Sequence, residues 1–145
     1  TTHFAAKNPA HITIANRTLS KAEAIAEEFK ALGATQSCHF EALERQSFDV
    51  IINATSASLS NELPPLPDGL LAKDGYCYDL AYGNQATPFV AWGISQQAQK
   101  SLDGLGMLVE QAAEAFYLWR GIRPETRAVI ALLNGERTAT LANDH

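Results

Sequence analysis

The chain has 145 residues, 46% of them hydrophobic, and this length and composition fit one globular domain. Its formal net charge is −5, with 11 Lys and Arg scattered among 16 Asp and Glu, which argues against a nucleic-acid partner because such a partner requires a basic surface. The sequence shows neither an apolar run long enough to span a membrane nor a signal peptide, so no membrane partner and a cytoplasmic location are expected.

The first predicted elements are a strand and a helix. Apolar and polar residues alternate over His11–Ala15, which is typical of a strand, and five apolar residues of Ser20–Leu32 share one helical face. The helix is expected to begin either at a capping box formed by its first residue with Glu23 or at Thr18 as the N-cap. Gly33 is expected to end it in a left-handed conformation.

Two further strands are predicted in the middle of the chain. A short strand is expected over Ser37–Phe40, and the strongest signal is Phe48–Thr55, whose β-branched apolar run is typical of a strand buried on both faces of a parallel sheet. The prolines of residues 64–67 indicate an irregular loop. Another strand, Gly75–Tyr82, follows it and ends in polar residues.

Helices are predicted for the rest of the chain. The first is expected over Phe89–Gln99. The second covers Met107–Arg120 and ends at Gly121, and the third covers Glu125–Asn134, directly after a proline. These C-terminal helices, from about residue 107 on, complete an alternation of strands and helices.

This alternation predicts an α/β fold with a doubly wound parallel sheet, in which ligands bind at the carboxyl ends of the strands. Polar residues follow three of the predicted strands, at Asn16–Thr18, Asn53–Ser58 and Asp79–Tyr82. Taken singly, each stretch is also consistent with a solvated turn. Three polar strand ends at one edge of a sheet favour a binding site.

Arg17 lies at the strand end where an acidic residue of a dinucleotide-binding fold usually holds the free 2′-hydroxyl of the adenosine ribose. A guanidinium instead matches a 2′-phosphate, because it is permanently charged and donates hydrogen bonds in a planar fork. Thr18 and Lys21 supply a hydroxyl and a second charge, so NADP is favoured over NAD. The alternative is that Arg17 and Lys21 only solubilise the first turn.

The cysteines and histidines indicate no metal site. Cys38 and Cys77 are far apart and form no CxxC pair, so free thiols in a reducing compartment are expected. The four histidines show no short ligand spacing. We therefore predict no metal ion.

Four motifs, in this order, carry a resemblance to a known family: "NRT" after the first strand, "DVIINATS", "YDLAYGNQATPF" and "DGLGMLVEQAAEAFYLW". From about Ile12 to Trp119 the chain resembles the nicotinamide-cofactor domain of shikimate dehydrogenase. The resemblance implies a Rossmann-like NADP-binding domain and an NADP-dependent oxidoreductase. The expected reaction is reduction of 3-dehydroshikimate to shikimate with NADPH, in the pathway through chorismate to the aromatic amino acids.

The resemblance also implies roles for individual residues. The adenosine 2′-phosphate would be bound by Asn16, Arg17, Thr18 and Lys21. The ribose and pyrophosphate would lie near Thr55 and Ser56. The nicotinamide would meet the backbone carbonyl of Gly104 and the side chain of Met107, and the substrate would meet Tyr82 and Gln111. Met107 and Gln111 are four residues apart, which places them on one helical face independently of the resemblance.

The family pattern is incomplete at the N-terminal end. The chain contains no GxGxxG turn. The family's first strand and its glycine-rich turn should precede the Ile12 strand by about twenty residues, and only about ten residues of the sequence precede it. In the expected strand order 3-2-1-4-5-6, that strand separates the His11–Ala15 strand from the Phe48–Thr55 strand. Residues 1–145 are thus expected to form a partial NADP-binding domain.

The family's catalytic Lys and Asp belong to an N-terminal substrate domain, so no catalytic residue is assigned in this chain, which alone should be inactive. Two other functions stay open: a noncatalytic NADP-binding regulatory module, and the NADP domain of another oxidoreductase such as a glutamyl-tRNA reductase. A homodimer is also left open. The sequence upstream of residue 1 would separate these readings.

Overall fold

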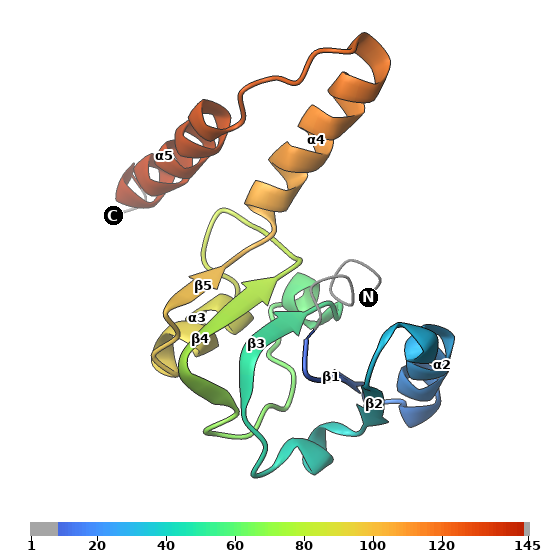
Figure 1. Cartoon of the computed structure of the whole chain (residues 1–145). Helices are drawn as coiled ribbons and strands as arrows, with labels where there is room; N and C mark the ends of the chain where they lie inside the picture. Colours follow the sequence, from blue (N-terminus) through green and yellow to red (C-terminus); the bar gives the residue numbers. More distant parts are fainter. Residues whose placement is uncertain (1–8, 144–145) are drawn as a thin grey trace. The chain divides into compact units, whose positions relative to one another are not determined.

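A computed structural model describes residues 9–143, which belong to two compact units (Figure 1). The first unit contains the described residues up to Ser47 together with Pro65–Leu70, and the second contains Phe48–Pro64 and the chain from Leu71 onward. Each unit combines helices with a parallel sheet, which confirms the predicted α/β class. No helix in the described part of the chain is long and apolar enough to cross a membrane.

The first unit is built on a two-stranded parallel sheet. Strand β1 (Ile12–Ala15) pairs with β2 (Thr35–Cys38), and helix α2 (Leu19–Phe29) connects them and contacts both. The 3-10 turns η1 (Lys30–Leu32) and η2 (Phe40–Leu43) follow α2 and β2. The predicted strand at Ser37–Phe40 is therefore shifted by two residues. The buried hydrophobic side chains of the first unit are Ala22, Ala26, Phe40, Leu43 and Leu70.

The structure decides between the two predicted starts of α2, and its C-terminal end differs from the prediction. The N-cap is Thr18, one of the two expected candidates, and the alternative capping box is absent because Ser20 already lies inside the helix. The helix tightens into η1 before it ends. Gly33 then has a φ of 151° and a ψ of −175°, which is not the left-handed helical conformation predicted for it. The chain at this glycine is already extending toward β2, with a φ that favours glycine over other residues.

The second unit contains a three-stranded parallel sheet in the order β3-β4-β5. Its strands are β3 (Phe48–Asn53), β4 (Leu71–Asp79) and β5 (Lys100–Leu102). The 3-10 turn η3 (Ala57–Ser60) follows β3, and helix α3 (Pro88–Ser95) connects β4 to β5 and contacts both strands. Strand β5 was not predicted, and α3 ends four residues earlier than expected.

One face of this sheet packs against α3 at a glycine. Cys77 pairs in register with Ile51 on one side and Ser101 on the other. A Cβ atom placed on Gly93 of α3 would lie 2.8 Å from the Cβ of Cys77 and would overlap the Ser101 hydroxyl. The helix therefore approaches the sheet as closely as it does only because residue 93 has no side chain.

The opposite face of the sheet is half exposed. Val50, Tyr76 and Leu102 lie on it and are 51%, 41% and 49% exposed. The expectation that the third strand is buried on both faces is thus wrong for the described residues, since only the face carrying Cys77 is closely covered.

Two helices complete the second unit (Figure 1). Helix α4 (Leu105–Arg120) ends at Gly121, as predicted, where a φ of 70° lets the Gly121 N–H donate to the Tyr117 carbonyl. Helix α5 (Arg127–Asn143) begins two residues later than predicted, extends further, and contacts α4.

The observed strand pairs agree with the predicted order 3-2-1-4-5-6, apart from position 1, to which no described strand corresponds. The pair β2-β1 corresponds to positions 3 and 2, and β3-β4-β5 corresponds to positions 4, 5 and 6. Within residues 9–143 no strand pairs with both β1 and β3. Each of these two strands therefore has one paired edge in the structure.

Candidate dinucleotide site at the strand ends

The turn after β1 presents a charged side chain on a fixed backbone. The side-chain oxygen of Asn16 accepts a hydrogen bond from the Thr18 N–H at 2.9 Å, and the Asn16 N–H donates to the Cys38 carbonyl at 3.3 Å. These two bonds tie the turn to the ends of both strands of the first unit. Arg17, between them, is exposed.

Lys21 lies in the first turn of α2 and is also exposed, with its N–H donating to the Thr18 carbonyl at 3.1 Å. Neither Arg17 nor Lys21 forms an ion pair within the described residues, and the first turn of α2 carries no acidic side chain. The helix N-terminus adds a partial positive charge to these two cations. This combination of a cationic fork, a point charge and a helix N-terminus is suited to binding a phosphate.

The second unit has a buried polar cluster at the carboxyl ends of β3 and β4. Asn53 and Asp79 are the last residues of these strands, are paired in register, and are 4% and 0% exposed. The side-chain amide of Asn53 donates to Asp79 Oδ1 at 3.1 Å. No group of three potential metal ligands occurs in the described part of the chain.

Thr55 shapes the loop that leaves β3. Its N–H and its hydroxyl both donate to the side-chain oxygen of Asn53, at 3.1 and 2.7 Å, and its hydroxyl oxygen accepts from the Ala57 N–H at 3.2 Å. The Thr55 hydroxyl is therefore occupied within the loop. Ser56, the next predicted cofactor residue, is exposed.

Gly104 is the N-cap of α4 and packs directly on the end of β4. Its N–H donates to the Ala81 carbonyl at 3.0 Å, and a Cβ at this position would overlap the Leu80 carbonyl oxygen. The Gly104 carbonyl, predicted to bind a nicotinamide carboxamide, accepts the Leu108 N–H at 3.0 Å. A carbonyl oxygen has two lone pairs, so one acceptor position is left for a ligand.

The remaining predicted residues are reachable from solvent. Met107 is half-buried and Gln111, one turn further along α4, is exposed; Tyr82, after β4, is 48% exposed.

Tyr78 of β4 forms a hydrogen bond with the first turn of α4. Burial raises the pKa of the Tyr78 hydroxyl, a hydrogen bond with the Met107 backbone lowers it, and the charge of Asp103 raises it.

Both cysteines are free thiols, as expected. Cys77 is buried, and burial raises its pKa to about 11. Burial also raises the pKa of Cys38. Neither thiol is therefore ionised near neutral pH, and neither is a candidate nucleophile.

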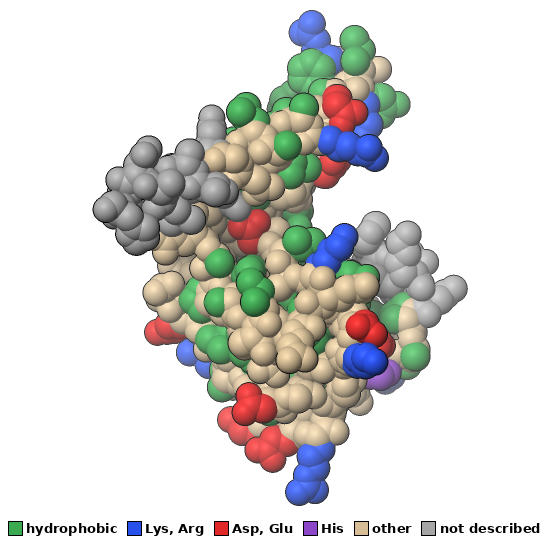
Figure 2. Space-filling model, turned by 90° about the vertical axis from the view of Figure 1, so that its left-hand side faces the viewer, with side chains coloured by type: hydrophobic (Ala, Val, Ile, Leu, Met, Phe, Trp, Pro, Cys, Tyr) green, Lys and Arg blue, Asp and Glu red, His purple; other side chains and the backbone are tan. Residues whose placement is uncertain are grey.

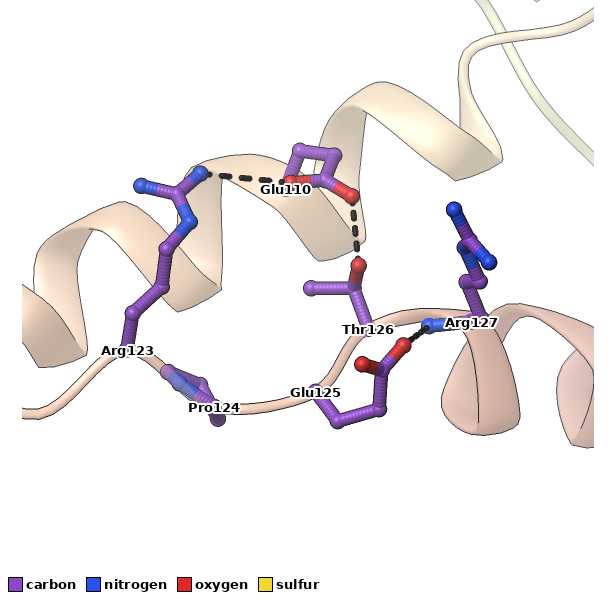
Figure 3. A pocket seen from close by; sticks show the side chains of 6 residues that line it. All are labelled: Glu110, Arg123, Pro124, Glu125, Thr126 and Arg127. Carbon is purple, nitrogen blue, oxygen red and sulfur yellow. Dashed lines mark hydrogen bonds and ion pairs between the residues drawn. The ribbon is translucent and has the colours of Figure 1, made fainter.

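A shallow cavity of about 640 Å³ lies where the chain passes from α4 to α5 (Figure 3). Its polar groups largely bind one another, since Glu110 accepts from Arg123 at 3.4 Å and from the Thr126 hydroxyl at 2.6 Å. Arg123 also pairs with Glu114. None of the predicted site residues lines the cavity, which is formed by Glu110, Arg123, Pro124, Glu125, Thr126 and Arg127.

Sequence reasoning assigned no role to four side chains that organise the site. Asn53, Ser58 and Asp79 were noted only as bounds of the polar stretches after strands, and Thr87 only as part of a motif. The structure brings all four together, because Ser58 and Thr87 both donate to Asp79 Oδ2 at 2.6 Å. The one signal in the sequence was an acidic residue at the end of an apolar strand.

Two family models match the chain. The model described as Shikimate / quinate 5-dehydrogenase matches residues 1–61, and that described as Shikimate 5'-dehydrogenase C-terminal domain matches residues 104–133. Among curated relatives, the shikimate dehydrogenase (NADP(+)) of Methylococcus capsulatus is 59% identical over 132 residues, which is 91% of this chain and 47% of the relative. That of Alkalilimnicola ehrlichii is 54% identical over 128 residues, 88% of this chain and 47% of the relative. The chain thus spans about half the length of the curated relatives that it matches.

Solved structures show the same likeness. An Ael1 enzyme from Pseudomonas putida is 51% identical with a TM-score of 0.75, covering 86% of this chain and 46% of its own. A shikimate 5-dehydrogenase from Thermus thermophilus, in complex with NADP(H) and shikimate, is 27% identical with a TM-score of 0.71, covering 91% of this chain and 48% of its own. These likenesses confirm the predicted Rossmann-like fold class.

Proposed function

Because the chain belongs to the shikimate dehydrogenase family, we propose that it forms the NADP-binding part of an enzyme that reduces 3-dehydroshikimate to shikimate with NADPH, in the pathway to the aromatic amino acids. Bound NADPH supplies the hydride. Two findings support the proposal. The curated relatives are named shikimate dehydrogenase (NADP(+)), and the Thermus thermophilus structure contains NADP(H) and shikimate. We propose that the active enzyme is as long as these relatives, and we refer to it as the full-length protein.

The adenosine 2′-phosphate is assigned to the turn after β1. Arg17 and Lys21 provide two positive charges there that form no ion pair with any residue the structure describes, and Thr18 provides a hydroxyl. Asn16 holds the turn through its bond to the Thr18 N–H. A 2′-phosphate would be bound by charge-assisted hydrogen bonds, which are about twice as strong as neutral ones.

The rest of the cofactor and the substrate are assigned to the second unit. Thr55 and Ser56 would lie near the ribose and pyrophosphate, and Gly104 and Met107 near the nicotinamide. The side chains of Tyr82 and Gln111, both exposed, would contact shikimate or 3-dehydroshikimate. No residue of this chain is assigned the proton transfer that accompanies hydride transfer, so residues 1–145 alone should not turn over.

The observation that carries this proposal is Arg17, which is exposed, forms no ion pair among residues 9–143, and lies at a strand end where an acid would select NAD. The test is reduction of 3-dehydroshikimate by the full-length protein with NADPH and with NADH. A much higher kcat/KM with NADPH is expected. NADPH binding without turnover would instead indicate the noncatalytic regulatory module, and equal use of both cofactors would overturn the assignment of Arg17.

Location and assembly belong to the same proposal. A cytoplasmic protein is supported by the two free thiols, since a reducing compartment keeps cysteines unpaired. Both units are proposed to be parts of one NADP-binding domain. Sedimentation of the full-length protein would distinguish a monomer from a homodimer.

A further inference from the structure

Asp79 is a buried acid that has no basic partner among the residues described by the structure. Its side chain is 0% exposed, and none of the ion pairs formed by the described residues involves it. Burial of a carboxylate is costly unless hydrogen bonds replace the lost water. The structure supplies four such bonds, and we name the five residues that form them the Asp79 network: Asp79, Asn53, Ser58, Ala81 and Thr87.

The four bonds occupy both carboxylate oxygens. Oδ1 accepts from the Asn53 amide and from the Ala81 N–H, both at 3.1 Å. Oδ2 accepts from the Ser58 and Thr87 hydroxyls, both at 2.6 Å. A carboxylate has about four acceptor positions, so its capacity is filled.

The two hydroxyls have fixed orientations. The Ser58 oxygen accepts the Asn53 amide at 3.0 Å, and the Thr87 oxygen accepts the Val90 N–H at 3.2 Å as the N-cap of α3. Each hydroxyl therefore points its proton at Asp79. An uncharged amide at position 79 would place donors where the network requires acceptors, so the arrangement specifies a carboxylate.

The four donors come from four segments at one edge of the sheet. Asn53 ends β3, Ser58 lies in η3, Ala81 follows β4, and Thr87 is the N-cap of α3. Two of the residues proposed to bind the cofactor are hydrogen-bonded to these donor residues. Thr55 donates to the Asn53 side chain, and Gly104 donates to the Ala81 carbonyl. Ser56 follows Thr55 in the chain, and Tyr82 follows Ala81.

We propose that Asp79 is a positioning residue, whose carboxylate holds the loops after β3 and β4 in the conformation that binds the dinucleotide and the substrate. This inference rests on the proposed function. Asp79 contacts neither ligand itself; it acts through Thr55, Ala81 and Gly104. If the network weakens, these loops populate other conformations, and the apparent affinity falls with the fraction that remains competent.

The test compares three variants of the full-length protein. Asp79→Asn keeps the shape and removes the charge, and Ser58→Ala removes one donor from a half-buried position and so is expected to fold. Ser60→Ala is the matched control, because Ser60 lies in the same turn, is exposed, and forms no side-chain hydrogen bond in the described part of the chain.

Two readouts are needed, both without turnover. Calorimetry of NADP+ binding, below the melting temperature of each variant, should give about tenfold weaker binding for Asp79→Asn, a smaller loss for Ser58→Ala and no change for Ser60→Ala. Hydrogen exchange of the unliganded protein should show faster exchange of the Thr55 and Ala81 amides in the first two variants, with the middle of α4 unchanged.

Unchanged NADP+ affinity in folded Asp79→Asn and Ser58→Ala, with only a lower melting temperature, would overturn the inference and leave Asp79 a purely structural residue. If Asp79→Asn does not fold, Ser58→Ala decides alone. Failure of the wild-type protein to bind NADP+ would instead overturn the proposed function, and the exchange of the Thr55 and Ala81 amides would still report whether Asp79 holds the loops.

Discussion

Arg17 and Lys30, which lie at opposite ends of helix α2, have different surroundings. Lys30 pairs with Glu27 at 3.3 Å, whereas Arg17 is exposed and has no acidic partner in the described residues. Arg17→Asp in the full-length protein should therefore weaken NADPH strongly and NADH little. The lost charge-assisted contact corresponds to about 1.5–3 kcal/mol, or roughly ten- to a hundredfold in affinity.

The measurement is steady-state kinetics of the Arg17 variant with both cofactors. Arg45→Asp is the control, since Arg45 is exposed, belongs to the same unit, and its replacement changes the net charge equally. It should leave both cofactors unaffected. Equal losses for NADPH and NADH in Arg17→Asp would show that the turn after β1 does not recognise the 2′-phosphate.

Gln111 tests whether α4 faces the substrate. Its side chain is exposed one turn after Met107, so replacing it should not disturb packing. Gln111→Ala in the full-length protein should raise the KM for shikimate and leave the Kd of NADP+ nearly unchanged. Gln99→Ala, at an exposed position outside α4, is the matched control. An unaltered dependence on shikimate would mean that Gln111 is an ordinary surface residue.

At the scale of elements, the packing of α3 on the sheet depends on one glycine. Gly93→Ala gains helix propensity, but its Cβ would collide with Cys77 and Ser101, and such overpacking costs about 1–3 kcal/mol. The Cβ added by Gly135→Ala in α5 would have no atom within 4 Å, so this substitution should stabilise the folded protein by about 1 kcal/mol. Urea unfolding of the full-length protein should thus give shifts of opposite sign, and a stabilised Gly93→Ala would contradict the close packing.

The elements that could be predicted are those with a local signal. Alternation and β-branched residues located β1 and β3, and Gly121 located the end of α4. The three residues of β5 lack such a signal, because they form a strand only by pairing with β4. The start of α2 was ambiguous between two local motifs, and Thr18 is the N-cap.

The candidate site was predictable to a similar degree. The polar stretches predicted the positions of Arg17 and Thr55 just after two strands, but single hydrogen bonds of the Asp79 network join residues up to 26 positions apart, and no local spacing indicates such contacts. The role of Asp79 follows from the parallel register that places it opposite Asn53. It could be inferred only once the two strands were paired.

At the scale of the whole molecule, each sheet has an inner strand with one neighbour. β1 pairs with β2 and β3 pairs with β4, and no strand within residues 9–143 pairs with both β1 and β3. Unpaired strand edges beside apolar side chains favour pairing with another chain. Apolar side chains are also exposed at the end of α4 (Figure 2), where Leu118, Trp119 and Ile122 are 73%, 80% and 68% exposed.

A polypeptide of these 145 residues alone is therefore expected to be unstable or to self-associate. Sedimentation over a range of concentrations should show species larger than a monomer, or unfolding should lack a cooperative transition. Val50→Lys places a charge on the exposed face of β3 and should reduce association, because charges on exposed strands oppose edge pairing. Leu59→Lys, at a residue 78% exposed outside the sheet, is the control and should have little effect. A cooperatively folded monomer of the unmodified polypeptide would refute the expectation, since both sheets would then be stable without a strand between β1 and β3.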